Sequence, residues 1–494
     1  MIRKDVAGTM LMAALLAACG CSKALSDGPY QATGIRIGEV TDNSTNIWTR
    51  LTRHPERVGP DAPMPKILYR ESKTGALLDK STGGKSGSTP VVRFPDSSTI
   101  ETIEGAVPGI PGKVRVLYRT AGESDWRATD WQAVDPKRDF THQFRLAKLA
   151  PAAKYQLRVE ARGDAGSQEG QVIEGAFKTA PPAQESKRVV FMVSTGQAYP
   201  DQDAPGGGYR IYTAMLKLDP DFFVHTGDIV YYDELAKTPA LARWHWASMY
   251  SLPTNLQFHR QVASYFIKDD HDTWMNDCWP GMKTTFMGEF TFEQGQAIFL
   301  EQMPMGDRTW RTFRWGKDLQ IWLVEGRDFR SPNTMRDGPD KTIWGKEQKE
   351  WFKRTVQESD ATFRILISPT PIVGPDRKNK HDNHSNKDFQ REGDELRKFI
   401  SEQKNVYVIC GDRHWQYISV DQKTGVREYS CGPASDKHAG GWTNDMRLPE
   451  HKYLNVVGGF LAGTVDRAEG KPTLTFRHYN VDGDVLNEDH LVAE

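Results

Sequence analysis

Residues 222–231 read Phe-Phe-Val-His-Thr-Gly-Asp-Ile-Val-Tyr, an apolar run followed by residues that can carry chemistry. Its apolar run passes directly into the polar residues His225-Thr226-Gly227-Asp228, and Tyr231 follows closely. Continuous apolar strands indicate a sheet covered on both faces, so the region 186–494 is predicted to be α/β. Five other apolar runs in this region also end in polar clusters, namely 189–193, 262–267, 319–324, 365–367 and 406–409.

The polar clusters contain the side chains that would carry chemistry. In open α/β sheets the active site lies beyond the carboxyl ends of the strands. One Asp at a strand end often caps the following helix. Helix capping does not account for several strands that end in Asp, His, Tyr and Arg. The residues concerned are Asp228, Tyr231, Asp269, Asp270, His271, Asp272, Asn276, Arg327, Asp412, Arg413 and His414.

This mixture of side chains indicates metal-assisted chemistry. Carboxylate, imidazole and phenolate groups are ligands of hard or borderline cations. The chain has no Cys-x-x-Cys pair, which excludes a structural thiolate zinc site. Two cations bridged by one carboxylate generate a nucleophilic hydroxide and clamp a transferring phosphoryl group. A free His can protonate the leaving oxygen, and an Arg can hold phosphate oxygens.

The region before the α/β part has the pattern of an all-β domain. Val114, Val116 and Tyr118 alternate with polar residues, as a half-buried strand should. Tyr155 opens a strand just after Pro151, which is typical of the tyrosine corner of Greek-key sandwiches. We therefore expect a fibronectin-III or immunoglobulin-like sandwich over 29–182, followed by a second domain over 186–494.

The first residues are predicted to be a targeting segment. Arg3 and Lys4 precede the short apolar run 6–18, which is too short for a permanent membrane span. The run ends in Leu16-Ala17-Ala18-Cys19, which resembles a bacterial lipobox with Cys19 as the lipidated residue. The alternative is an ordinary secretory signal cleaved nearby. With 1–19 as signal peptide, we expect an exported periplasmic or cell-envelope lipoprotein, held at the membrane by its lipid anchor.

Composition limits the remaining possibilities. The chain has 64 Lys and Arg against 65 Asp and Glu, a net charge of −1. A strongly basic nucleic-acid binder is therefore excluded, and no sequence-specific nucleic-acid binding is expected. Five cysteines in 494 residues are too few for a disulfide scaffold. The oligomeric state stays open.

Three motifs resemble those of one family. Gly227-Asp228-Ile229-Val230-Tyr231, the Asp-Asp-His-Asp block at 269–272 and Gly411-Asp412-Arg413-His414 look like PhoD-like alkaline phosphatases of the metallophosphoesterase superfamily. The resemblance covers nearly the whole mature chain. It implies a four-layer αββα domain and hydrolysis of phosphate mono- and/or diesters by a metal-activated hydroxide. It also implies a small phosphorylated substrate and divalent or trivalent cofactors, namely Ca²⁺ and Fe³⁺.

The resemblance also assigns roles by position. Asp228 would bridge two metals and Tyr231 would bind the ferric ion, and a core tyrosine is the alternative for Tyr231. His271 and Arg327 would be catalytic, although a salt bridge to Asp328 or Glu325 is the alternative for Arg327. We interpret Asp269 and Asp272 as supporting carboxylates or helix caps. The other predicted metal ligands are Asp270, Asn276, Asp412 and His414.

One departure from the family pattern concerns the first strand. The family has a Cys on iron where this chain has Gly196, and the superfamily's alternative Asp is Ser194 here. Gln197, Asp201 or a water could replace the missing ligand, and His438 is expected at the rim of the cleft. The missing ligand puts the iron site in question. It motivates one alternative, a non-catalytic envelope binding protein on this scaffold. Another alternative is a hydrolase of a different ester, such as a sulfate ester.

Overall fold

The computed structural model describes residues 28–80, 88–95, 97–165 and 168–494. The predicted leader, including Cys19, lies outside these residues. Among the residues described, no helix is long and apolar enough to cross a bilayer. Cys278, Cys410 and Cys431 are buried free thiols.

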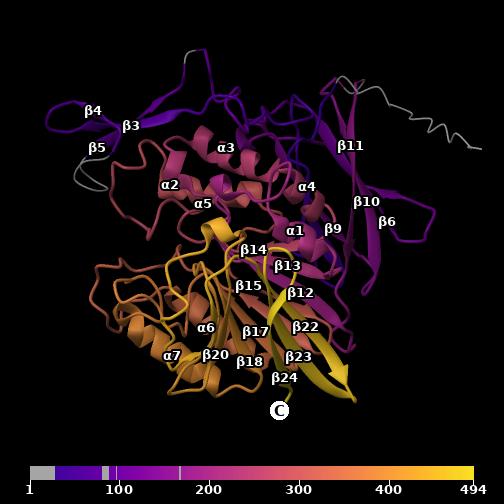
Figure 1. Ribbon diagram of the computed structural model, residues 1–494. Coiled ribbons are helices and arrows are strands. Elements are labelled where there is room, and N and C mark those ends of the chain that lie inside the picture. The colour runs from indigo at the N-terminus through magenta and orange to yellow at the C-terminus, as the bar shows by residue number, and fades with distance from the viewer. Residues whose placement is uncertain (1–27, 81–87, 96, 166–167) are drawn as a thin grey trace, which may run out of the picture.

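The largest sheet has nine strands and joins the first three strands of the α/β region to its last three and to three strands from the N-terminal region (Figure 1). Its four central strands, β12, β13, β14 and β1, pair in parallel, and the outer pairs are antiparallel. The strand order is β24 (Val485–Val492), β23 (Lys471–Tyr479), β22 (Phe460–Ala468), β12 (Val189–Ser194), β13 (Phe222–His225), β14 (Ala263–Phe266), β1 (Ile35–Gly38), β2 (Ser44–Arg50) and β9 (Thr141–Ala147).

The second large sheet has seven strands and contains the second half of the α/β region. Its strands β16, β17, β18 and β20 pair in parallel, so their carboxyl ends lie at one edge of the sheet. The strand order is β15 (Arg311–Trp315), β16 (Leu319–Leu323), β17 (Phe363–Ser368), β18 (Val406–Cys410), β20 (Arg427–Cys431), β19 (Gln416–Val420) and β21 (His451–Asn455).

The two large sheets pack face to face and helices cover their outer faces (Figure 1). Phe222 stacks on Trp315 across the sheet interface, with ring centroids 4.7 Å apart. The helices on the nine-stranded sheet are α1 (Arg210–Leu216), α2 (Tyr232–Leu235), α3 (Pro239–Tyr250), α4 (Pro253–His259) and α5 (Phe292–Gln302), and those on the seven-stranded sheet are α6 (Gly345–Glu358) and α7 (Gln390–Ser401).

Local sequence explains where these helices form. In α6 the buried residues Gln348, Phe352 and Val356 recur every four positions, so one face of the helix packs on the sheet. Helix α3 begins with Pro239 directly after Thr238, whose side chain accepts a hydrogen bond from the N–H of Leu241. Helix covering on both outer faces explains why the strands are apolar throughout.

Strands from the N-terminal region divide between sheets. β1, β2 and β9 extend the nine-stranded sheet, because β1 pairs with β14 at Gly38 and Ser264. A five-stranded sheet packs on them through Val116 and Leu157. It consists of β11 (Glu169–Lys178), β10 (Lys154–Arg162), β6 (Lys113–Thr120), β7 (Arg127–Ala128) and β8 (Gln132–Ala133), and a separate three-stranded sheet contains β4 (Leu77–Leu78), β3 (Lys66–Glu71) and β5 (Ser88–Arg93).

The prediction of a mixed α/β fold with several sheets is confirmed. The six predicted strands correspond to β12, β13, β14, β16, β17 and β18, with ends that agree within two residues. The hydroxyl of Tyr155 accepts a hydrogen bond from the N–H of Ala150 at 2.7 Å, the contact that defines a tyrosine corner. The division into domains 29–182 and 186–494 stays a prediction.

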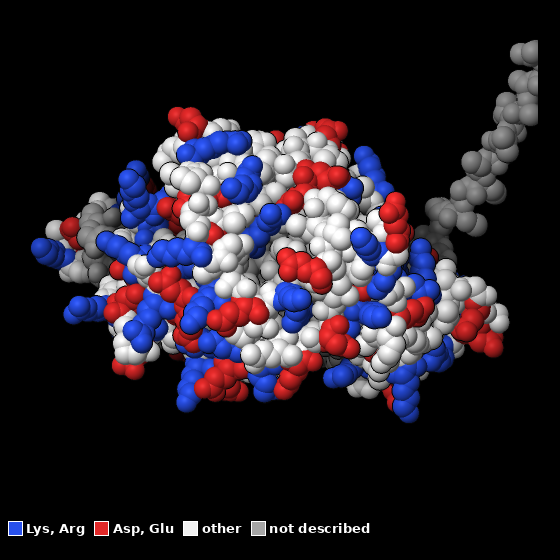
Figure 2. All heavy atoms as spheres, turned by 90° about the horizontal axis from the view of Figure 1, so that it is seen from below, with Lys and Arg blue, Asp and Glu red and all other residues white. Residues whose placement is uncertain are grey.

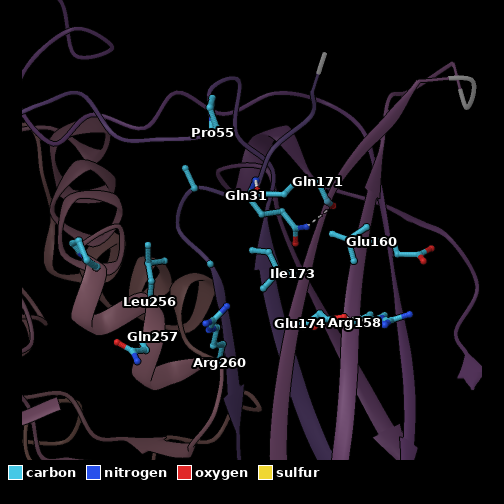
Figure 3. A pocket seen from close by; sticks show the side chains of 14 residues that line it. Gln31, Pro55, Arg158, Glu160, Gln171, Ile173, Glu174, Leu256, Gln257 and Arg260 are labelled. Carbon is cyan, nitrogen blue, oxygen red and sulfur yellow. Dashed lines mark hydrogen bonds and ion pairs between the residues drawn. The ribbon is translucent and has the colours of Figure 1, made fainter. Parts of the chain in front are cut away.

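The surface carries charges of both signs. Figure 2 shows the face seen from below the view of Figure 1, where Lys and Arg alternate with Asp and Glu. A hollow of about 850 Å³ opens between α4 and the strands β10 and β11 (Figure 3). Arg158, Glu174 and Arg260 line it, and none of the predicted site residues does.

Candidate metal centre and active site

The loops that follow the parallel strands of both sheets meet at one place. Gly411, directly after β18, lies close to two of the other loops: a Cβ there would lie 2.6 Å from Oγ1 of Thr226 and 2.7 Å from the carbonyl oxygen of Pro369. Only glycine fits between these loops. Asp228 (φ 56°) and Asp412 (φ 59°) both adopt the left-handed conformation. Such backbone strain in non-glycine residues is concentrated at functional sites.

Carboxylates from three loops converge there. Oxygen atoms of Asp228, Asp269 and Asp412 lie within 4.8 Å of one another, as do ligand atoms of Asp228, Asp270 and His271. Burial raises the pKa of Asp228 well above its usual value, and the charges of Asp270 and Asp269 add to this effect. Burial raises the pKa of Asp412 to about 7. Burial therefore disfavours the charged form of both carboxylates.

This cluster fits a cation. Oδ1 of Asp228 and Oδ2 of Asp269 are buried and have no hydrogen-bond partner among the described residues. A buried carboxylate oxygen without a donor is costly unless a cation binds it. Carboxylates with an adjacent imidazole and phenol are the donors that hard and borderline cations prefer. The residues present therefore fit divalent metal binding.

The phenol of Tyr231 lies between two imidazoles. Its Oη is 2.6 Å from Nε2 of His438 and 3.5 Å from Nε2 of His414. Nε2 of His414 is 3.7 Å from Oδ2 of Asp228, so this group adjoins the carboxylates. Sequence reasoning expected Tyr231 and His414 together. It expected His438 only at the rim, whereas the structure brings His438 into contact with Tyr231.

Gln197 and Asp201, the two residues considered as replacements for the missing ligand at position 196, have different partners. Gln197 is buried, and its Oε1 accepts a hydrogen bond from the hydroxyl of Tyr212. Asp201 approaches the site through His438, whose Nδ1 is 2.8 Å from Oδ2 of Asp201. The ring of His438 lies against Gly196, because a Cβ on Gly196 would be 3.3 Å from Cδ2 of His438.

His271 has a carboxylate partner that the sequence analysis missed. Its Nδ1 is 2.8 Å from Oδ1 of Asp233, and the other oxygen of Asp233 accepts the N–H of Asn276 at 3.2 Å. Burial opposes a positive charge on the imidazole, but Asp233 and Asp270 outweigh it and raise the pKa of His271 well above its usual value. These carboxylates therefore favour the protonated imidazole, which is the form that can donate a proton. The hydrogen bond from the N–H of Asn276 to Asp233 places Asn276 next to the cluster.

Arg327 is fully buried behind the carboxylates. Its Nε is 2.6 Å from Oδ1 of Asp269, and its Nη2 is 3.6 Å from Oδ2 of Asp270. Lys268 makes the side-chain ion pairs with Glu325 and Asp328 that we considered for Arg327, at 2.7 and 2.6 Å.

The other basic and acidic residues of the motifs hold the cluster in place. Arg413 is fully buried between Asp376 and Asp412. Asp272 accepts backbone N–H groups of Ile229 and Asp269, as expected of a supporting carboxylate. Asp269 itself belongs to the carboxylate cluster, a position that the sequence analysis did not propose for it.

Two face-to-face sheets with helices outside, and a cluster of carboxylates, imidazoles and a phenol at their carboxyl ends, are features of metallophosphoesterases. The fold is similar to that of a purple acid phosphatase from yellow lupin seeds, with a TM-score of 0.55 and 13% identity over 93% of this chain and 74% of that one. It is similar to the solved structure of PhoD, with a TM-score of 0.68 and 17% identity over 95% of this chain and 90% of that one.

A family model confirms the resemblance seen in the motifs. The model of the PhoD-like phosphatases matches residues 191–453, and the chain belongs to this family. Alkaline phosphatase D of Bacillus subtilis is 23% identical over 365 residues. The match spans 59% of this chain and 59% of the length of that relative.

Proposed function

We propose that this chain is an exported, metal-dependent phosphoesterase that hydrolyses phosphate mono- and/or diesters. The observation that carries the proposal is the convergence of Asp228, Asp412, Tyr231 and His414 at one edge of the sheets, with His271 beside them. Membership of the PhoD-like phosphatase family supports the same activity.

The residues that would hold the metals are those predicted from the sequence, and Asp228 would serve both metals. Asp270, Asn276 and Asp412 offer oxygen atoms, which suit calcium. Tyr231 and His414 offer a phenol and an imidazole, which suit iron. Bound cations supply Lewis acidity that activates water and polarises phosphoryl oxygens. We also propose that region 186–494 forms a four-layer αββα domain.

The chain's own residues then orient the substrate and move one proton. His271 donates its Nε2 proton to the oxygen of the leaving alcohol, and Asp233 holds the imidazole charged and in one orientation. Arg327 fixes Asp269 and Asp270 through Nε and Nη2. Its buried Nη1 has no hydrogen-bond partner among the described residues and would be available to a substrate oxygen. Arg413 fixes Asp412 from the other side.

The decisive experiment compares the purified chain with Asp228→Ala on an aryl phosphate monoester, a diester and a sulfate ester. Loss of phosphate release in a variant that keeps the wild-type circular dichroism spectrum supports the proposal. Activity that survives in Asp228→Ala contradicts it. Tight binding of phosphorylated ligands without turnover favours a binding protein. Turnover of the sulfate ester alone favours a different hydrolase.

Export and lipid anchoring are proposed from the Leu-Ala-Ala-Cys sequence at 16–19. We expect the wild-type chain to appear in the membrane fraction of a bacterial host. Cys19→Ser should shift it out of the envelope-anchored pool, because the thiol that receives the lipid is missing. Equal membrane partition of both chains would contradict lipidation.

A further inference from the structure

His438 is held in a fixed position beside the phenol of Tyr231. It ends the short turn Asp436–His438, which follows β20. The N–H of Ala434 donates to the carbonyl oxygen of Gly196, and the N–H of Gly440 donates to that of His414, both at 2.9 Å. These two bonds tie the segment on either side of His438 to the loops after β12 and β18. Backbone hydrogen bonds therefore fix the position of His438 in the site.

The two ring nitrogens of His438 have different partners, and Nε2 is the nitrogen that faces the candidate metal site. Nδ1 lies 2.8 Å from the carboxylate of Asp201, which accepts the Nδ1 proton. Nε2 then carries the lone pair and is directed at Tyr231, 2.6 Å away. A carboxylate behind one nitrogen and a donor cluster in front of the other is the usual environment of a metal-binding histidine. The imidazole therefore has the orientation that a ligand needs.

Gly196 and His438 are sterically coupled. A Cβ at position 196 would lie 3.2 Å from Nε2 of His414 and 3.3 Å from Cδ2 of His438. The absence of a side chain there lets the two imidazoles lie side by side, with ring centroids 4.2 Å apart. Position 196 thus has no side chain, and the imidazole of His438 takes the adjacent space.

We propose that His438 is a ligand of the metal bound by Tyr231 and His414, and that Asp201 is the positioning residue that orients it. His438 occupies the place that a side chain at position 196 would take. Two imidazoles and a phenol select a transition metal such as iron over calcium, which prefers oxygen donors alone. This inference rests on the proposed metal-dependent function and specifies one of its metal sites.

The test measures metal content and spectrum as well as activity. The full chain is stripped of metal, titrated with iron or zinc, and bound equivalents are counted by mass spectrometry. Phenolate bound to ferric iron gives a visible charge-transfer band, so Tyr231 reports on this site. The variants are His438→Ala, His438→Gln and Asp201→Asn. His438→Gln preserves the side chain's bulk and hydrogen bonding, so it keeps the test valid if His438→Ala folds poorly.

We expect both His438 variants to bind the transition metal at least tenfold more weakly and to shift or lose the charge-transfer band. Asp201→Asn should weaken binding by about 10–100-fold, the usual effect of losing the carboxylate behind a metal-bound histidine. Gly196→Cys in the His438→Ala background should restore tight binding, because a thiolate then enters the vacated space. The matched control is His381→Ala, which removes a histidine paired with a carboxylate, Asp388, outside the site.

Wild-type affinity and an unchanged band in both His438 variants would overturn the inference and leave the proposed function intact. A wild-type chain that binds neither metal and hydrolyses no phosphate ester would instead contradict the proposed function. Loss of the band in His381→Ala as well as in the His438 variants would show a general loss of structure and overturn the specific assignment.

Discussion

Nδ1 of His271 lies 2.8 Å from Oδ1 of Asp233, and this pair sits beside the carboxylates of Asp228 and Asp270. The pair favours the charged, proton-donating form of His271, because Asp233 and the neighbouring carboxylates raise the pKa of the imidazole well above its ordinary value. Asp233 comes from α2 and His271 from the loop after β14, so the contact depends on the packing of that helix against the sheet.

Asp233→Asn should lower kcat for a substrate with a poor leaving group by about 100-fold, within the range that general-acid catalysis contributes. The carboxylate raises the pKa of His271, so its removal lowers that pKa. The alkaline limb of the pH–kcat profile should therefore move to lower pH. The measurement is kcat against pH for an alkyl phosphate and for a nitrophenyl phosphate, whose leaving group needs no proton. Equal losses on both substrates would contradict the general-acid role.

Gly411→Ala should weaken metal binding and destabilise the fold by about 1–3 kcal/mol, the usual cost of forcing extra atoms into a packed site. The added Cβ would clash with Thr226 and with the carbonyl oxygen of Pro369, which pushes Asp412 away from Asp228. Urea unfolding and metal titration check both effects. Gly59→Ala is the control, since nothing lies within 4 Å of its Cβ position. Wild-type metal affinity in Gly411→Ala would contradict this account of the loop contact.

Arg327→Gln should destabilise the metal-free chain by about 3–5 kcal/mol, because it leaves the buried carboxylate of Asp269 without its partner. Arg354→Gln, which breaks an exposed pair with Glu358, should cost less than about 1 kcal/mol. Chemical unfolding in the presence of a chelator measures both. A rise in KM with unchanged stability would show that Arg327 binds substrate instead of holding Asp269.

His245→Phe should make the fold less sensitive to acid. Burial lowers the pKa of His245 from 6.5 to about 3. Below pH 6.5 the unfolded chain therefore binds a proton on this imidazole, whereas the folded chain does not bind it until about pH 3. The free energy of unfolding falls as the pH falls through this window. At pH 5 the loss from this residue is about 2 kcal/mol.

The measurement is the difference in unfolding free energy between pH 7.5 and pH 5, in chelator so that metal loss does not contribute. His245→Phe should show a smaller difference than wild type. The exposed His54, replaced by Phe, should leave the difference unchanged. An identical pH dependence in wild type and His245→Phe would refute the assignment.

Sequence patterns predicted the strands and their polar ends because both are local. The apolar runs around Val193, Val224 and Ile409 need only their own composition to be identified as buried strands. Gly227 and Asp228 stand next to such a run, so their position at a strand end is also local information. The order of these motifs along the chain was sufficient to indicate the family.

The parts that sequence reasoning missed depend on long-range packing. Tyr231 and His438 are 207 residues apart, and their contact exists only because the loop after β20 is tied to Gly196. The pairing of β1 with β14 likewise joins residues more than 200 positions apart. Asp233 could have been noticed five positions after Asp228, but only the fold shows that it faces His271.

Metal dependence is tested by phosphate release from the purified chain before and after chelation, with metal content counted at each stage. We predict that EDTA abolishes hydrolysis of an aryl phosphate, and that calcium with iron restores it in wild type but not in Asp228→Asn. Undiminished hydrolysis by a chain that carries less than one metal per molecule would contradict a metal-dependent phosphoesterase.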